Sequence, residues 1–182
     1  MMNRFETSQW VPFPVDLVFA FFANPSNLLH LVPDELETQI LDVRLKPAPP
    51  RPPASPLLRH FPSEVAGEGS EIEISFKPLG WAPKVKWTAR ITEFVWNSHF
   101  CDDQVKGPFR TFHHRHEVRE EVRDGVRGTV VTDIVDYQPP FGVLGMLGNP
   151  VVKRQLAHRF AHRQAMLPES LLVAARLAEQ LG

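Results

Sequence analysis

The 182-residue sequence has only one cysteine, Cys101, and no long run of apolar residues. A single cysteine excludes an internal disulfide framework and the usual cysteine-based zinc sites, and it favours a reducing compartment. No stretch approaches the roughly 18 apolar residues of a membrane span, and residues 1–10 lack the apolar core of a signal peptide. We therefore expect a cytoplasmic protein without a membrane span.

The sequence also lacks an excess of charge of either sign. Lys and Arg total 20 and Asp and Glu total 21, so no global field favours binding to nucleic acid or to an anionic membrane. The basic residues Lys153, Arg154, Arg159 and Arg163 form only a local cluster. The length and the 43% of hydrophobic residues fit one globular domain over residues 1–182. We expect a monomer or a homodimer with no nucleic-acid partner.

The segment from Asn149 to Leu181 is the longest periodic stretch, and it predicts a major helix. Asn149 is a good N-cap, and Pro150 occupies the first helical position, where its missing N–H costs nothing. Apolar residues then recur at three- and four-residue steps, which places them on one stripe of the helix. Pro168 lies within this stretch, so we expect a kink or a break between residues 150–166 and 169–181.

The chain before residue 47 predicts strands and two short helices. The expected elements are a strand at Asn3–Val11, a short helix from Val15 that closes at Asn24-Pro25, a second helix through Leu31 and a strand at Glu35–Lys46. Six prolines between Pro47 and Pro56 cannot join a sheet. We therefore expect residues 47–68 to form a surface loop that is exposed and mobile over residues 47–56, or alternatively a docking motif for a proline-recognising partner.

Strands are clearer after Gly69. Apolar and polar residues alternate at residues 71–77 and 85–92, so each strand has one dry face. The next expected strands are Trp96–Gln104, Phe109–Glu120 and, after the two-residue hairpin signal Asp124-Gly125, Val126–Tyr137. The result is an antiparallel meander, followed by a Pro/Gly-rich loop from Gln138 to Gly148 that leads into the long helix.

Four sets of residues carry a resemblance to a known family. They are Phe13-Pro14-Val15-Asp16-Leu17-Val18-Phe19 with Asn24-Pro25 and Leu28; Phe100-x-Asp102-x-Gln104-x-x-Gly107-Pro108-Phe109; Phe112-x-His114-x-His116; and Asp133-x-x-x-Tyr137-x-x-Pro140-Phe141-Gly142. With this order of elements, the chain resembles the START and pollen-allergen-like helix-grip superfamily, also called SRPBCC or polyketide cyclase/dehydrase-like. Within it, the chain is most similar to the bacterial ligand-binding SRPBCC proteins.

The resemblance covers nearly the whole chain except the proline-rich insertion at about 47–68. It implies an α+β helix-grip fold, in which a curved antiparallel sheet of about six to seven strands wraps around the long C-terminal helix. It also implies a cavity between sheet and helix for an apolar small molecule. It names no substrate, since such folds carry binding, transport and catalysis alike.

The hairpin at Asp124-Gly125 places two histidines near a carboxylate. A two-residue turn pairs Val118 with Val131, His116 with Asp133, His114 with Val135 and Phe112 with Tyr137. His114 and His116 then share the inward face of their strand. The pair of His116 and Asp133 could orient a general base, or it could be a buried polar pair that holds the register of the sheet.

Arg163 lies within the apolar stripe of the long helix, so we expect its guanidinium to reach the cavity. It needs an acceptor there, either Asp102 or Asp133 or an acidic group of a ligand. The expected ligand-binding residues are Trp87, Phe100, Asp102, Phe112, His114, His116, Asp133, Tyr137, Phe160 and Arg163.

The sequence leaves two functions open. The first is binding of a hydrophobic or amphipathic small molecule in the cavity. The alternative is a cyclase or dehydratase that uses His116 and Asp133 as an acid–base pair on a polyketide-like or isoprenoid-like substrate. We expect no cofactor and no metal, because only His114 and His116 can converge and no set with zinc-like spacing completes a ligand shell. Cys101 is expected to be a small surface or edge residue.

Overall fold

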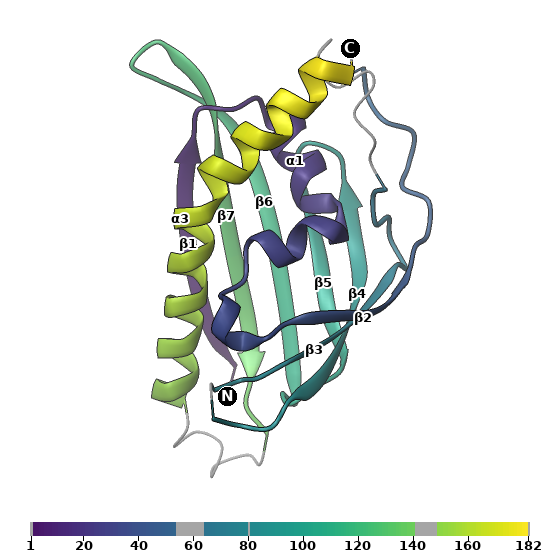
Figure 1. Ribbon diagram of the computed structural model, residues 1–182, viewed down its shortest axis with the longest axis vertical. Helices are drawn as coiled ribbons and strands as arrows, with labels where there is room; N and C mark the ends of the chain where they lie inside the picture. The colour runs from purple at the N-terminus through teal and green to yellow at the C-terminus, as the bar shows by residue number, and fades with distance from the viewer. Residues whose placement is uncertain (1, 54–63, 80, 141–148, 182) are drawn as a thin grey trace.

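The structure is a computed structural model that describes residues 2–53, 64–79, 81–140 and 149–181. In these ranges the elements are β1 (Asn3–Val11), α1 (Val15–Ala23), the 3₁₀ helices η1 (Pro25–His30) and η2 (Asp34–Leu36), β2 (Gln39–Arg44), β3 (Glu71–Phe76), β4 (Val85–Val95), β5 (His99–Lys106), β6 (Thr111–Arg123), β7 (Val126–Gln138) and α3 (Asn149–Leu181). Figure 1 shows their arrangement. Of these described helices, none is both long and apolar enough to cross a membrane.

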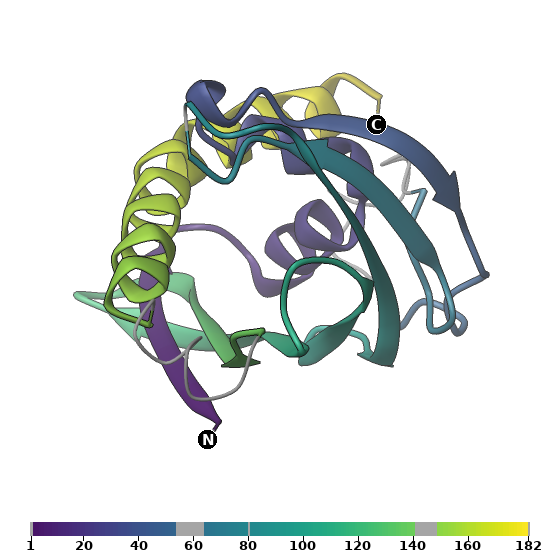
Figure 2. The same cartoon turned by 90° about the horizontal axis from the view of Figure 1, so that it is seen from below.

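The seven strands of the described chain form one sheet in the order β1-β7-β6-β5-β4-β3-β2, and every neighbouring pair is antiparallel. Figure 2 shows the sheet curled around α1 and η1, with α3 running across its open side. The expected α+β helix-grip fold is therefore confirmed. The two expected short helices are present, although the second is a 3₁₀ helix.

The turn at Asp124-Gly125 sets the register of β6 and β7. Both residues have positive φ, 50° and 78°, as the two central positions of a tight hairpin turn require. The pairing runs from Arg123 opposite Val126 to Thr111 opposite Gln138 without a register shift. The predicted partners of Phe112, His114, His116 and Val118 are all confirmed.

Two predicted strands have different bounds. The strand expected from Trp96 begins at His99, because a turn separates β4 from β5: Asn97 has a φ of 58°, and the N–H of Ser98 donates to the carbonyl of Val95 at 3.2 Å. The strand expected at Glu35–Lys46 begins only at Gln39. Its first residues instead form η2, which ends where Glu37 adopts a φ of 46°.

The helix α3 is continuous across Pro168 in the part of the chain that the structure describes, so the predicted break is wrong. The predicted kink is confirmed, since the axis of α3 changes direction near its middle in both views (Figures 1 and 2). The two halves of α3 therefore cover different parts of the sheet. This is the expected effect of a proline ring that crowds the preceding turn.

The helix α1 is buried almost all round, as a helix inside the grip must be. Seven of its nine residues are buried, including Leu17, Val18 and Phe19. The core around it separates into three clusters. One joins α1 to β4, β5 and the second half of α3; the second joins β7 to the first half of α3; the third joins η2 to β3 and β4.

The described part of the proline-rich insertion is attached at its base. The N–H of Gly67 donates to the carbonyl of Lys46 at 3.1 Å, and a Cβ at Gly67 would lie 2.5 Å from the carbonyl oxygen of Pro47. Only glycine, which has no Cβ, can lie this close to the backbone of Pro47. Nε1 of Trp96 also donates to the carbonyl of Pro49 at 2.8 Å.

The exposure predicted for the insertion is confirmed for most of residues 47–53, and the predicted mobility stays a prediction. Residues 54–63, which include the end of the segment 47–56, lie outside the described residues. The same holds for residues 141–148 of the predicted Gln138–Gly148 loop.

Cys101 is fully buried, with 0% exposure, which contradicts its expected place at a surface or edge. It lies in β5, a central strand, on the face opposite Phe100 and Asp102. There Glu93 of β4 and Arg115 of β6 flank it in the register and contact its sulfur. Long charged side chains of two neighbouring strands therefore cover this cysteine.

Candidate functional site

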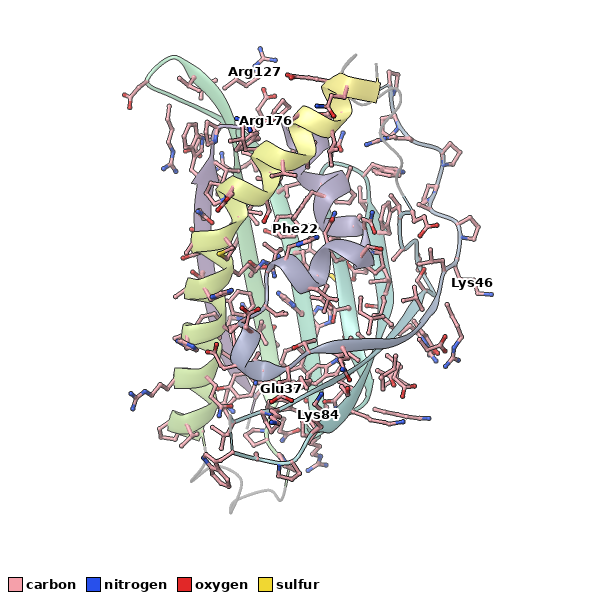
Figure 3. All side chains as sticks on the ribbon, in the orientation of Figure 1. Phe22, Glu37, Lys46, Lys84, Arg127 and Arg176 are labelled. Carbon is pink, nitrogen blue, oxygen red and sulfur yellow. The ribbon has the colours of Figure 1, made fainter. Side chains whose placement is uncertain are left out.

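A cavity of about 280 Å³ lies where the three core clusters approach one another, between the sheet and α3. Its size is close to the lower end of typical ligand pockets, about 300–1,000 Å³. The apolar wall draws on all three clusters, with Ile91 and Phe100, Leu156 and Phe160, and Leu36, Phe76 and Trp87. Phe22, at the end of α1, also lines it and is labelled near the middle of Figure 3.

Asp133 of β7 is the centre of a buried polar cluster beside this cavity. One of its carboxylate oxygens contacts three side chains. Oδ1 lies 3.1 Å from Nε2 of His114, 3.1 Å from Nδ1 of His116 and 3.2 Å from Nη2 of Arg163. Asp133 is 5% exposed and His114 is 9% exposed. The alternation along β6 and the hairpin register bring the two histidines to the carboxylate, and α3 supplies the arginine.

A second carboxylate, Asp102 of β5, closes the cluster from the other side. Its Oδ2 lies 3.1 Å from Nε2 of His116 and 3.7 Å from Nδ1 of His114. The ring of His116 stacks on Phe100, with centroids 4.2 Å apart. His116 is therefore held between two carboxylates and one aromatic face.

Arg163 reaches the cavity as predicted. Its side chain is 13% exposed, and its guanidinium lies over the ring of Phe22 at 4.4 Å and near that of Phe160 at 5.6 Å. Nη2 is also 3.2 Å from Nδ1 of His116. Because a guanidinium can only donate, this nitrogen of His116 can pair with Arg163 or with Asp133 but not with both.

The pKa values of the two histidines move in opposite directions. Burial alone would lower the pKa of His116, but hydrogen bonds to Asp102 and Asp133 outweigh it and raise the pKa above its ordinary value. Burial and the nearby charge of His116 lower the pKa of His114, although its bond to Asp133 opposes them. The cluster thus favours a charged His116, which donates to both carboxylates, and a neutral His114.

Both carboxylates are favoured in their charged form. Burial alone would raise the pKa of Asp133, but the Arg163 guanidinium and the bonds from both histidines hold it well below its usual range. The pKa of Asp102 is lowered in the same way, since its bond to His116 outweighs burial. The cluster therefore favours a state in which two anions face two cations, Arg163 and His116, with no net charge.

The arrangement limits the chemistry of the predicted catalytic pair. Each ring nitrogen of His116 faces a carboxylate, so this residue has no free lone pair to accept a proton. Asp102, His114 and His116 place possible metal ligands within 4.8 Å of one another. An ion would have to displace the hydrogen bonds of His116, and the expected absence of a metal stays a prediction.

The structure brings eight of the ten predicted site residues to the cavity wall. They are Trp87, Phe100, Asp102, Phe112, His114, His116, Phe160 and Arg163. Asp133 and Tyr137 are not among the lining residues. Asp133 lies behind the histidines, whereas Tyr137 is 0% exposed and donates its hydroxyl to Oδ1 of Asn149 at 2.6 Å. Tyr137 thus anchors the start of α3, and the Asn149 side chain bonds Tyr137 and Asn3.

Several lining residues were not predicted. The η1–η2 region contributes a whole wall, with Pro25, Leu28, Leu31, Val32, Pro33 and Leu36. Arg159, one turn before Arg163 on α3, also lines the cavity. A sequence signal for Arg159 exists, because residues four apart on a helix share a face and Arg163 was already predicted to point inward.

The family model described as polyketide cyclase/dehydrase and lipid transport matches residues 11–163. The chain belongs to this family. Membership confirms the superfamily inferred from the sequence motifs, and the finer bacterial subgroup stays a prediction. The match extends from the end of β1 through the sheet to Arg163, so it includes every residue of the polar cluster. A search of curated proteins found no match.

Solved structures share the fold of this polyketide cyclase/dehydrase and lipid transport family member. The protein TTHA0849 from Thermus thermophilus is 16% identical with a TM-score of 0.60, over 94% of this chain and 99% of that chain. A START superfamily protein from Mycobacterium smegmatis is 10% identical with a TM-score of 0.61, over 92% and 96%. The protein CV1439 from Chromobacterium violaceum is 10% identical with a TM-score of 0.58, over 91% and 97%. At these identities the likeness shows the fold alone.

Proposed function

We propose that this protein binds a hydrophobic or amphipathic small molecule in the cavity between the sheet and α3. The supporting observation is that the wall is mainly apolar and aromatic, while the cluster of Asp102, His114, His116 and Arg163 around Asp133 satisfies its own charges. Such a wall stabilises apolar surface, and the few polar groups orient the ligand. The family's description, which includes lipid transport, agrees with this proposal.

The test is binding of the neutral dye N-phenyl-1-naphthylamine, measured by its fluorescence. Ala89 of β4 lines the cavity, so Ala89→Trp should fill it and abolish binding. Lys86→Trp is the matched control, because Lys86 is an exposed residue of the same strand and does not line the cavity. Equal dye binding by both variants and the wild type would overturn the proposal.

Native mass spectrometry of protein purified from its own cells would identify the ligand. A molecule retained by the wild type and absent from Ala89→Trp gives the ligand class directly. The cytoplasmic location and the absence of a nucleic-acid partner remain part of the proposal.

One observation favours a second function, a cyclase or dehydratase. His114 lines the cavity, its pKa is lowered, and its Nδ1 is 3.7 Å from Asp102, beyond hydrogen-bond distance. A neutral imidazole with one unbonded nitrogen can act as a general base. The test is incubation of the retained molecule with fresh protein, followed by liquid chromatography and mass spectrometry. A loss of water or a shift in retention time at the same mass, abolished by His114→Gln, supports dehydration or cyclisation, and an unchanged mass and retention time support binding alone.

A further inference from the structure

Arg159 of α3 lines the same cavity as Arg163, but its surroundings are different. Its guanidinium lies over the ring of Phe76, with Cζ 5.1 Å from the centroid. Phe76 is 5% exposed and is itself part of the cavity wall. The charge of Arg159 is therefore held against the inner surface of the pocket, on the side of β3 and η2.

This guanidinium has almost no partner in the protein. Its contacts in the described chain are the stacking on Phe76 and one long hydrogen bond, in which Nη2 donates to the carbonyl of Pro78 at 3.4 Å. It has no carboxylate partner in the described ranges, and the residues outside those ranges include no Asp or Glu. An arginine carries five N–H donors, so most of them are left for solvent or for a ligand.

Glu35 and Glu37, the acidic side chains near this end of the cavity, already have other partners. Glu35 accepts from His158 at 2.9 Å. Glu37 pairs with Lys77 and, at 3.6 Å, with Lys84, which is labelled beside it in Figure 3. Burial lowers the pKa of Arg159, which indicates that its charge is partly desolvated. An arginine of this kind is the natural partner of a planar anion.

Arg163 does not play this role, because Asp133 already neutralises it. The two arginines thus divide the cavity into a neutral end at the polar cluster and a cationic end at Arg159. We propose that the ligand is a hydrophobic organic acid, whose carboxylate binds Arg159 while its apolar body occupies the space lined by Phe76, Trp87 and Phe112. This inference rests on the proposed function and specifies the chemical class of its ligand.

The experiment is displacement of N-phenyl-1-naphthylamine by decanoic acid and by 1-decanol near neutral pH. The two competitors have the same chain length and differ in charge. The wild type should prefer the acid by about tenfold or more, as a charge-assisted hydrogen bond predicts. Arg159→Met should remove this preference, so that the acid displaces the dye no better than the alcohol does. Arg154→Met, an exposed change on the same helix that does not touch the cavity, should keep it.

Arg159→Gln provides a second neutral variant in case the Met variant does not fold, and it should lose the preference equally. The inference is overturned if the wild type binds the dye and the alcohol but does not prefer the acid. It is also overturned if a folded Arg159 variant keeps the full preference. Absence of dye binding in the wild type would overturn the proposed function itself, so the two failures are distinguishable.

Discussion

Nε2 of Gln9 in β1 donates a hydrogen bond of 2.8 Å to the backbone carbonyl of Gln164 in α3. In an uninterrupted helix this carbonyl would accept from the residue four positions later, which is Pro168 and has no N–H. The side chain of Gln164 donates in return to Oγ1 of Thr7 at 2.9 Å. The first strand thus satisfies the carbonyl that the proline leaves without its helical partner.

This relationship predicts a measurable coupling between Gln9 and Pro168. Gln9→Ala should cost about 1–2 kcal/mol of unfolding free energy, because it leaves the carbonyl without its donor. In a Pro168→Ala background a backbone N–H replaces that donor, so the same change should cost less by about 1 kcal/mol. Urea unfolding of both single variants and the double variant measures this coupling. If the losses of unfolding free energy in the two single variants simply add up in the double variant, Gln9 does not compensate for the proline.

Asp133→Asn should destabilise the protein by about 3–5 kcal/mol, because it leaves the charge of Arg163 buried without its carboxylate. Asp136→Asn is the control from the same strand, since Asp136 pairs with Arg4, whose side chain is 63% exposed. It should change the urea midpoint much less. Similar losses in the two variants would contradict the central role of Asp133.

Stability should fall as the pH rises above neutral, in part because of His116. The pKa of His116 is raised above its ordinary value of 6.5, so its stabilising contribution is complete below pH 6.5 and is lost as the pH passes through the raised value. His116→Asn should flatten this limb of the curve of unfolding free energy against pH.

His114, Asp102 and Asp133 act in the opposite direction. The pKa of each is lowered, so the stability that depends on them is lost as the pH falls. The unfolding free energy of the wild type should therefore be highest at intermediate pH, between the loss of stability in acid and the loss above neutral pH. A stability that keeps increasing well above neutral pH would show that His116 is neutral in the folded protein.

The thiol of Cys101 should react slowly with thiol reagents such as dithiobis(nitrobenzoate). Burial, helped by the hydrogen bond to Glu93, raises the pKa of this thiol to about 11, so the reactive thiolate is scarce. Reaction in urea should be faster by orders of magnitude. Fast labelling of the native protein would show that the cover formed by Glu93 and Arg115 opens readily.

Trp87→Ala should cost about 3–5 kcal/mol of unfolding free energy. Trp87 is 9% exposed, and its ring contacts those of Phe112, Phe109 and Phe76 at centroid distances of 4.6, 5.8 and 6.2 Å. Trp81→Ala is the control, because Trp81 is 85% exposed and should contribute little. A loss under about 1 kcal/mol at Trp87 would contradict its place on the inner face.

The parts of the fold that follow from local rules were predictable. The turn residues Asp124 and Gly125 set the register, and strict alternation along β6 then placed His114 and His116 on the inner face. The inward position of Arg163 followed from helical periodicity in the same way. These rules depend only on neighbours in the sequence.

The parts that depend on contacts between distant elements were not predictable. The sequence paired Asp133 with His116 and left Arg163 a choice of Asp102, Asp133 or a ligand, whereas the structure brings His114, His116 and Arg163 to the one carboxylate of Asp133. Tyr137 was assigned to the ligand because it faces inward, but the start of α3 covers it. No periodic pattern in the sequence predicts that η1 and η2 line the cavity. The sequence likewise gives no sign that Glu93 and Arg115 bury Cys101.

The hydrogen bond between Lys46 and Gly67 has a consequence for the history of the protein. It joins the two ends of the proline-rich insertion, and its two groups belong to the backbone, so the closure does not depend on the sequence between them. Closing a longer loop costs only about 0.6 kcal/mol for each doubling of its length. Evolution can therefore lengthen, shorten or replace the segment beyond this closure while the grip around the cavity keeps its stability, provided that residue 67 remains glycine.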